Sequence, residues 1–176
     1  MNNLPMGATI GILGGGQLGR MLSVAASRLG YKTHIYEPAA NPPAADVAHA
    51  VTTASYDDIA ALQAFAAQVD VITYEFENIP TAALDALEAL RPIRPNRRAL
   101  AISQDRMLEK DFLTKLGLTC APYAFVQTLS DLEAAIASIG TPAILKTTRL
   151  GYDGKGQARI KSSADAAEAH ASMAGA

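Results

Sequence analysis

The segment Thr9-Ile-Gly-Ile-Leu-Gly-Gly-Gly-Gln-Leu-Gly19 decides the fold of this 176-residue chain. It starts with a short apolar run typical of a buried strand, and glycines then allow a tight turn. Apolar residues recur at helical spacing after the turn: Leu18, Met21, Leu22, Ala25 and Leu29. Gly30 ends this helix and a second strand follows over residues 32–36, so we predict the opening βαβ unit of a nucleotide-binding-type domain.

The alternation of strand and helix continues to about residue 98. We expect a weak strand near residues 48–51, a helix from about Asp57, a strand over residues 71–74 and a helix that starts at Pro80 or Thr81. The segment Arg91-Pro-Ile-Arg-Pro95 stops that last helix. This order predicts an α/β fold, a Rossmann-like domain over residues 1–98 with a parallel sheet covered on both faces.

The sequence after residue 98 predicts a helical connector over residues 99–120 and a small, incomplete α+β lobe over residues 121–176. In this lobe we expect a strand over residues 123–126, a helix capped by Ser130, and a short strand over residues 143–145 that delivers Lys146. The alanine-rich tail over residues 164–176 is helix-prone but has little apolar stripe to anchor it, so we expect that end of the chain to fray.

Composition narrows the class of protein. The formal net charge is -2 and 49% of the residues are hydrophobic, which is typical of a globular protein and gives no electrostatic reason to expect nucleic acid or an anionic membrane as a partner. The chain contains a single cysteine, Cys120, and no secretory signal pattern, so we expect a cytoplasmic location. The three histidines show no metal-ligand spacing.

The first candidate site is the glycine turn itself. Gly14, Gly16 and Gly19 fit the G-x-G-x-x-G pattern, and Glu37 ends the second strand where a carboxylate could take a ribose hydroxyl, so NAD binding is one hypothesis. The range of possible ligands is wider than NAD, because a turn at a helix N-terminus suits any anionic or polar small ligand. Gln17 and Arg20 place polar groups near it.

The second candidate is the pair Glu75 and Glu77, just beyond the carboxyl end of a predicted strand. Residues two apart in extended backbone share a face, and open α/β sheets bind ligands at this edge. The pair is interpreted either as solvated carboxylates in a connection or as a proton acceptor and partner for a ligand amine.

The third candidate combines Lys146 with the loop around Gly151, Gly154 and Gly156, which carries Lys155. Glycines let backbone amides approach phosphate oxygens, so the segment predicts a strand-loop-strand phosphate cover; the alternative is a glycine-rich hairpin with solvated charges. Arg106, in the first turn of a predicted helix, faces either a ligand or a neighbouring carboxylate.

Four motifs together carry a family resemblance. The chain resembles the N5-carboxyaminoimidazole ribonucleotide synthetases, ATP-grasp enzymes of purine biosynthesis, over nearly its whole length. The motifs are Gly14-Gly-Gly-Gln-Leu-Gly-Arg-Met21, Tyr74-Glu-Phe-Glu-Asn78, Asp105-Arg106 with Lys110, and Lys146 with Gly151-Tyr-Asp-Gly-Lys-Gly-Gln157.

The resemblance implies ATP-dependent carboxylation of 5-aminoimidazole ribonucleotide by bicarbonate, through carboxyphosphate. The implied catalytic residues are Tyr152, Asp153, Lys155, Glu75 and Glu77. The implied ATP contacts are Arg106, Lys146, Gly151, Tyr152, Asp153, Gly154, Lys155, Gly156 and Gln157. The implied substrate contacts are Gly16, Gln17, Leu18, Glu75 and Glu77.

The resemblance also implies a homodimer and a need for Mg²⁺. Its members run to about twice this length, so we expect the metal ligands outside these residues and expect the 176-residue chain alone to be inactive. Two other functions stay open: a non-catalytic module that binds a small ligand, and an NAD-dependent oxidoreductase, although the resemblance opposes the second.

Overall fold

The computed structural model describes residues 4–151 and 155–173. The chain forms two compact units, Met1–Ala101 and Ile102–Ala176. The first unit contains β1 (Thr9–Leu13), α1 (Gln17–Arg28), β2 (Lys32–Tyr36), the 3₁₀ helix η1 (Pro43–Asp46), β3 (Ala50–Thr52), α2 (Ile59–Ala67), β4 (Val71–Tyr74) and α3 (Thr81–Glu88). Helix α4 (Arg97–Ser103) crosses the boundary.

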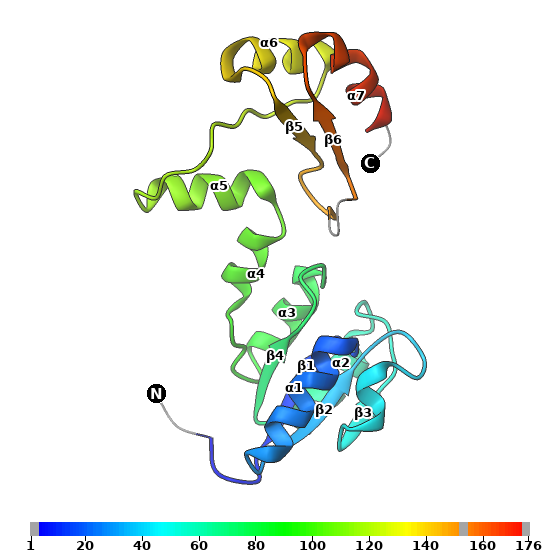
Figure 1. Ribbon diagram of the computed structural model, residues 1–176. Coiled ribbons are helices and arrows are strands. Elements are labelled where there is room, and N and C mark those ends of the chain that lie inside the picture. The colour runs from blue at the N-terminus through cyan, green and yellow to red at the C-terminus, as the bar shows by residue number, and fades with distance from the viewer. Residues whose placement is uncertain (1–3, 152–154, 174–176) are drawn as a thin grey trace. The chain divides into compact units, whose positions relative to one another are not determined.

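The first unit is built on a parallel four-stranded sheet with the order β3-β2-β1-β4 (Figure 1). The register places Leu13, at the end of β1, beside Tyr36 of β2 and Tyr74 of β4. The chain order of the strands reverses between β1 and β4, and ligands of open α/β sheets bind outside such a switch point. The predicted α/β fold with a parallel sheet is therefore confirmed.

Apolar residues cover both faces of this sheet. On one face, Phe65 of α2 and Leu84 of α3 pack with Leu13 and Ile72 in the main core. On the other face, Ile12 and Ile35 pack with Ala44 of η1 in a smaller cluster. Successive residues of β1 therefore enter different clusters, because neighbouring side chains of a strand point to opposite faces of the sheet.

Helix α1 is confirmed, but the residues that define its apolar repeat lie on its outer side. Its buried residues are the small ones, Gly19, Ser23 and Ala26. Small side chains let a helix backbone approach a sheet closely, so the larger apolar side chains have no room beneath it. The exposed ones include Leu18, Met21, Leu22 and Leu29.

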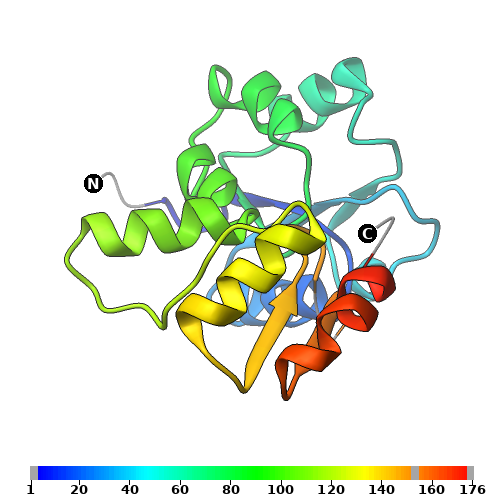
Figure 2. The ribbon, with the colours of Figure 1, turned by 90° about the horizontal axis from the view of Figure 1, so that it is seen from above.

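The second unit is an antiparallel hairpin covered on one face. It contains α5 (Arg106–Lys115), α6 (Leu129–Ile139), β5 (Ala143–Lys146), β6 (Gln157–Ile160), a 3₁₀ turn η2 (Ser163–Asp165) and α7 (Ala166–Ser172). Helices α6 and α7 lie beside this hairpin (Figure 2). Leu145 and Ile160 pack with Leu132 of α6 and Ala169 of α7. Because side chains alternate along a strand, Ile144 and Lys146 lie on the opposite, exposed face.

Two expectations for this unit are wrong. Residues 123–126 form no strand, because the described sheet here has only β5 and β6 and offers them no ladder. Helix α6 starts earlier than predicted, since Thr128 rather than Ser130 is its N-cap, in a capping box with Asp131. The helix-prone tail forms α7, in which Ala166 and Ala169 are buried; the predicted fraying of its end concerns residues 174–176, which lie outside the described residues.

None of the described helices combines the length and the apolarity that a membrane crossing requires.

Candidate functional site

The first part of the site is the glycine turn between β1 and α1. Each of its three leading amides donates a hydrogen bond within the chain. Gly14 N–H donates to the carbonyl oxygen of Tyr36 at 3.0 Å. Gly15 N–H donates to Oε2 of Glu37 at 2.8 Å, and Gly16 N–H donates to Oε1 of Glu75 at 2.9 Å. Two carboxylates therefore lie on the turn.

The glycines are required because these side chains lie against the turn. A Cβ added to Gly14 would meet Cγ of Glu75 at 2.7 Å, and one added to Gly16 would meet Oε1 of Glu75 at 3.0 Å. A Cβ at Gly15 would meet Pro42 at 2.7 Å. Gly14 also has a φ of 102°, a backbone conformation that favours glycine.

Glu37 has both carboxylate oxygens engaged by backbone amides. Oε2 accepts from Gly15, and Oε1 accepts from Ala39 N–H at 3.0 Å. The NAD hypothesis requires that Glu37 accept a hydrogen bond from a ribose hydroxyl. In this geometry the carboxylate bonds backbone amides of the chain instead.

Glu75 is held differently. Its own N–H donates to the Leu13 carbonyl at 3.1 Å, which extends the β1–β4 ladder by one residue. Oε1 accepts from Gly16, whereas Oε2 has no hydrogen-bond partner within residues 4–151 and 155–173. Of the predicted pair, Glu75 is the residue that the structure brings to the turn, and it keeps one oxygen available as an acceptor.

Tyr56, which the sequence analysis missed, lies beside these carboxylates. Its ring stacks at a tilt on Tyr36, with centroids 5.6 Å apart. Its hydroxyl is 3.5 Å from the Tyr36 carbonyl oxygen, the same atom that accepts from Gly14. Burial raises the pKa of Tyr56, and the charges of Glu37 and Glu75 raise it further, so the hydroxyl stays protonated.

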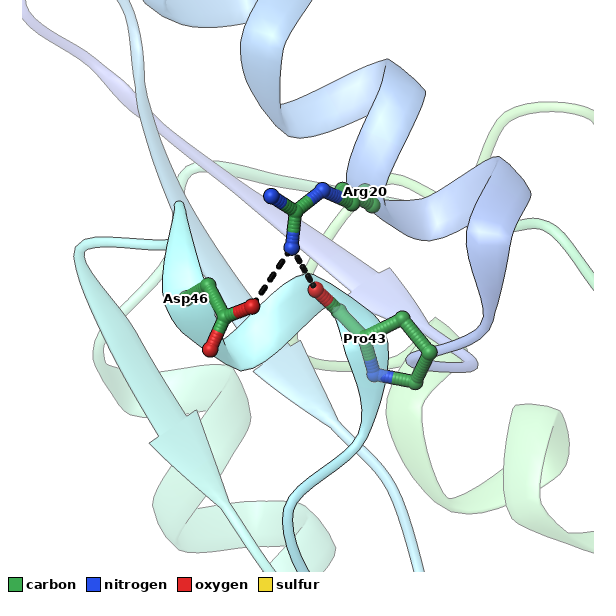
Figure 3. A network of polar contacts seen from close by, with 3 residues as sticks. All are labelled: Arg20, Pro43 and Asp46. Atoms are coloured by element: carbon green, nitrogen blue, oxygen red, sulfur yellow. Dashed lines mark hydrogen bonds and ion pairs between the residues drawn. The ribbon is translucent and has the colours of Figure 1, made fainter.

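Arg20 does not face the mouth of the turn. Its guanidinium Nη1 donates to the Pro43 carbonyl at 2.8 Å and pairs with Asp46 at 2.6 Å (Figure 3). Ala44 N–H also donates to the Gly15 carbonyl, so the proline-rich segment is fastened over the turn from two sides. The arginine therefore supports the turn. The neighbouring residues Gln17 and Leu18 begin α1 with exposed side chains.

The second part of the site lies in the second unit, where Arg106 holds the start of the glycine loop. Its Nε donates to the Thr147 carbonyl at 3.1 Å and its Nη2 to the Gly151 carbonyl at 2.8 Å. Its backbone N–H donates to the Thr148 carbonyl. Among the described residues, the guanidinium of Arg106 bonds backbone carbonyls and no carboxylate, and its predicted contact with a ligand stays a prediction.

A second arginine fastens the same stretch. Arg149 Nη2 donates to Oε1 of Gln104 at 2.9 Å, and Gln104 is buried. Between the two arginine contacts, Leu150 adopts a left-handed φ of 60°. A non-glycine residue in this region is strained, and such residues are concentrated at ligand sites.

Lys146 lines a hollow of about 540 Å³ within the second unit. Arg106 and Lys110 line the same hollow, together with Tyr123 and Ile144. Lys110 lies over the Tyr123 ring, 5.2 Å from its centroid. Three cations beside aromatic and aliphatic surface can hold a ligand that combines a planar ring with several negative charges.

The remaining loop residues are only partly described. Tyr152, Asp153 and Gly154 lie outside the described residues. Lys155 is exposed, and Gln157 pairs with Lys146 across the hairpin. Gly156 has a φ of 63°, and a Cβ there would meet Oγ1 of Thr147 at 2.5 Å. The backbone of Gly156 therefore lies close to the Thr147 side chain where the loop joins β6.

The sequence motifs included Lys110, although not among the implied site residues, and they gave no indication of Tyr56. Lys110 lies one helical turn after Arg106, so both face the same side of α5. Tyr56 belongs to the β3–α2 connection, and nothing in its local pattern indicates that it reaches the end of β2. The described part of the chain contains no group of three or more His, Cys, Asp or Glu side chains able to hold a metal ion.

Two family profiles match consecutive parts of the chain. The profile of the ribonucleotide synthetase preATP-grasp domain matches residues 7–104. The profile of the ATP-grasp domain matches residues 111–176. The first covers more than half of the chain.

Individual relatives agree with both profiles. The N5-carboxyaminoimidazole ribonucleotide synthase of Brucella melitensis is 53% identical over 160 residues, which are 91% of this chain and 44% of the relative. A structure of N5-carboxyaminoimidazole synthetase from Staphylococcus aureus complexed with ADP has a TM-score of 0.94 at 40% identity, covering 100% of this chain and 47% of that one.

A third relative is the Aspergillus clavatus enzyme in complex with ADP and 5-aminoimidazole ribonucleotide. Its structure has a TM-score of 0.85 at 30% identity and covers 96% of this chain and 44% of that one. The chain thus spans less than half the length of these relatives. The resemblance read from the four motifs is confirmed, and the chain belongs to the family defined by the ribonucleotide synthetase preATP-grasp domain.

Proposed function

We propose that this chain provides the amino-terminal part of a carboxylating ligase that forms N5-carboxyaminoimidazole ribonucleotide. ATP would phosphorylate bicarbonate to carboxyphosphate with release of ADP. The exocyclic amine of 5-aminoimidazole ribonucleotide would then attack the carboxyphosphate carbon, lose a proton and release inorganic phosphate. The observation that carries this proposal is the hollow in the second unit, which Arg106, Lys110 and Lys146 all line.

The second unit supplies the nucleotide side of the reaction. Positive groups that are already in place stabilise the charge that develops during phosphoryl transfer, and Lys146 and Arg106 are such groups. Arg106 also supports the loop through the Gly151 carbonyl. Gly151, Lys155, Gly156 and Gln157 would add contacts from the loop, as would Tyr152, Asp153 and Gly154.

The first unit supplies the amine side. A carboxylate oxygen without a partner, next to a glycine turn at the carboxyl edge of the sheet, suits a ligand group that donates hydrogen bonds. Glu75 fits this description, so we assign it, rather than Glu77, to orient the substrate amine. Gly16, Gln17 and Leu18 would border the same ligand.

Magnesium would neutralise the triphosphate when bound, and its ligands would come from the part of the relatives that this chain does not span. We therefore expect the 176 residues alone to release no phosphate from ATP. A homodimer, bicarbonate as the carboxyl donor and a cytoplasmic location belong to the same proposal.

The test measures phosphate release by the full-length protein with bicarbonate and 5-aminoimidazole ribonucleotide. Lys146→Ala should lower kcat/KM for ATP by at least about tenfold, because one charged hydrogen bond to phosphate is worth about 1.5–3 kcal/mol. Lys161→Ala, which removes an exposed lysine just beyond β6, is the matched control and should have no effect.

The two glutamates are compared in the same assay. Glu75→Gln should raise KM for the ribonucleotide much more than Glu77→Gln does, with KM for ATP unchanged in both. Equal rates for Lys146→Ala and Lys161→Ala would refute the assignment of the hollow to ATP. Equal effects of the two glutamate substitutions would refute only the assignment of Glu75.

A further inference from the structure

The amides of the glycine turn are already bonded to acceptors from the chain itself. Glycine turns that open a helix commonly hold phosphate, because their N–H groups and the positive end of the helix dipole both favour an anion. In this chain the atoms at those amides are a carbonyl oxygen of Tyr36 and carboxylate oxygens of Glu37 and Glu75. Two of the three acceptors are themselves anions.

Glu37 is the more firmly fixed of the two carboxylates. It follows directly after β2, its N–H donates to the Thr52 carbonyl at 3.0 Å, and its two oxygens accept from Gly15 and Ala39. Removing it from the turn would break two charge-assisted hydrogen bonds. An incoming phosphate would have to do this while it approached a second carboxylate on Glu75.

We propose that Glu37 is a specificity-determining residue that keeps the phosphate group of a ligand away from the amides of this turn. It acts as an internal anion at the position where a dinucleotide would place its phosphate. The proposal rests on the proposed function only in treating the turn as part of the ligand site.

The consequence for recognition follows from charge. With Glu37 at Gly15, the groups that the turn offers to a ligand are acceptors, above all Oε2 of Glu75. A ligand group that donates a hydrogen bond, such as an amine or a hydroxyl, is accepted at the turn, and a phosphate group is rejected there. The G-x-G-x-x-G spacing thus serves here to bind carboxylates of the chain, which explains why the spacing alone wrongly predicts a phosphate at the turn.

The test is an NMR titration of the 176-residue chain with inorganic pyrophosphate, read at the backbone amides of Gly15 and Gly16. These amides report on the turn alone, so binding of pyrophosphate near Arg106 and Lys146 does not interfere. In the unsubstituted chain we expect no saturable shift of either signal. Glu88→Ala, which removes an exposed carboxylate on α3, should behave in the same way.

Glu37→Ala should produce saturable shifts of both amides, with pyrophosphate bound at least about tenfold more tightly than by the unsubstituted chain, as the loss of a competing charged hydrogen bond predicts. Glu37→Gln keeps an acceptor oxygen but removes the charge, so it should fold even if the alanine variant does not, and should give a smaller gain.

Saturable shifts of the Gly15 and Gly16 signals in the unsubstituted chain would overturn the proposal, because the carboxylate would then be displaced readily. So would the absence of any gain in both Glu37 variants, which would assign Glu37 a purely structural role. Neither result depends on ATP or on carboxylation, so this test can fail while the proposed function stands.

Discussion

The two glycine-rich segments of this chain are fastened by groups of opposite charge. In the first unit, the amides of Gly15 and Gly16 donate to carboxylates. In the second unit, the carbonyls of Thr147 and Gly151 accept from the guanidinium of Arg106. Similar composition thus produces an acceptor site in one unit and a cationic site in the other. The polar partners, more than the glycines, decide what each segment can bind.

The largest expected effect is on the first segment. Gly14→Ala should destabilise the chain by about 3 kcal/mol, because a left-handed alanine costs roughly 1–2 kcal/mol and the new Cβ overlaps Glu75. Gly7→Ala is the matched control, since Gly7 has a φ of 83° with nothing within 4 Å of its Cβ position. Urea unfolding should show a loss of only about 1 kcal/mol for it. Equal losses would mean that the carboxylate does not press on the turn.

The second segment should respond to the loss of its arginine. Arg106→Met removes two side-chain hydrogen bonds to backbone carbonyls and should cost about 1–2 kcal/mol, since the group is partly exposed. Hydrogen exchange of the amides of residues 147–151 should become faster. Lys110→Met, at the same hollow, should leave that exchange unchanged. If both variants accelerate it equally, Arg106 does not hold the loop.

Leu150 allows a test in the opposite direction. Leu150→Gly should stabilise the second unit by up to about 1 kcal/mol, because glycine adopts a φ of 60° without strain. Leu116→Gly, at an exposed leucine with a φ of -81°, should destabilise it instead. Thermal unfolding measures both. A lower melting temperature for Leu150→Gly would show that the leucine side chain stabilises the unit by more than its left-handed backbone conformation destabilises it.

The smallest expected effect is a difference between the two units in how their stability depends on pH. Burial lowers the pKa of His34 in the first unit below 6.5, so the unfolded chain binds the extra proton and stability falls as the pH drops below about 6.5. Asp131 in the second unit has a pKa below 3.8 because Thr128 N–H bonds its carboxylate, so its contribution is lost only at lower pH.

Unfolding curves between pH 7 and pH 5 should therefore show the first unit weakening first. His34→Gln should reduce this slope, while Asp131→Asn should leave it as it is. A slope that survives His34→Gln would assign the sensitivity to other groups.

The sequence predicted the first unit well because its signals are local. The apolar run before Gly14, the glycine at residue 30 and the alternation that follows each depend on neighbouring residues. The burial of α1 could not be predicted in this way, because three small residues and not the apolar repeat face the sheet. Helix periodicity shows that two faces differ but does not show which one the fold covers.

In the candidate site, too, some features have local sequence signals and others depend on the tertiary fold. Glycine spacing indicated the position of both segments, and the end of β4 indicated Glu75. Hydrogen bonds between distant residues decide the rest: Glu37 to Gly15, Arg106 to Gly151 and Arg149 to Gln104. Such pairings depend on the tertiary fold, so no local pattern carries them. The predicted strand over residues 123–126 failed for the same reason, because a strand needs a neighbour.

Tyr36 gives the first unit a property that the contacts around it do not suggest one by one. Its ring lies in the main core, its carbonyl accepts from Gly14, and its hydroxyl donates to the Ser55 carbonyl at 2.6 Å. One residue thus ties the interior, the ligand edge and the β3–α2 connection together. A movement of the glycine turn away from Tyr36 would consequently also disturb the packing of the main core and the anchoring of the β3–α2 connection.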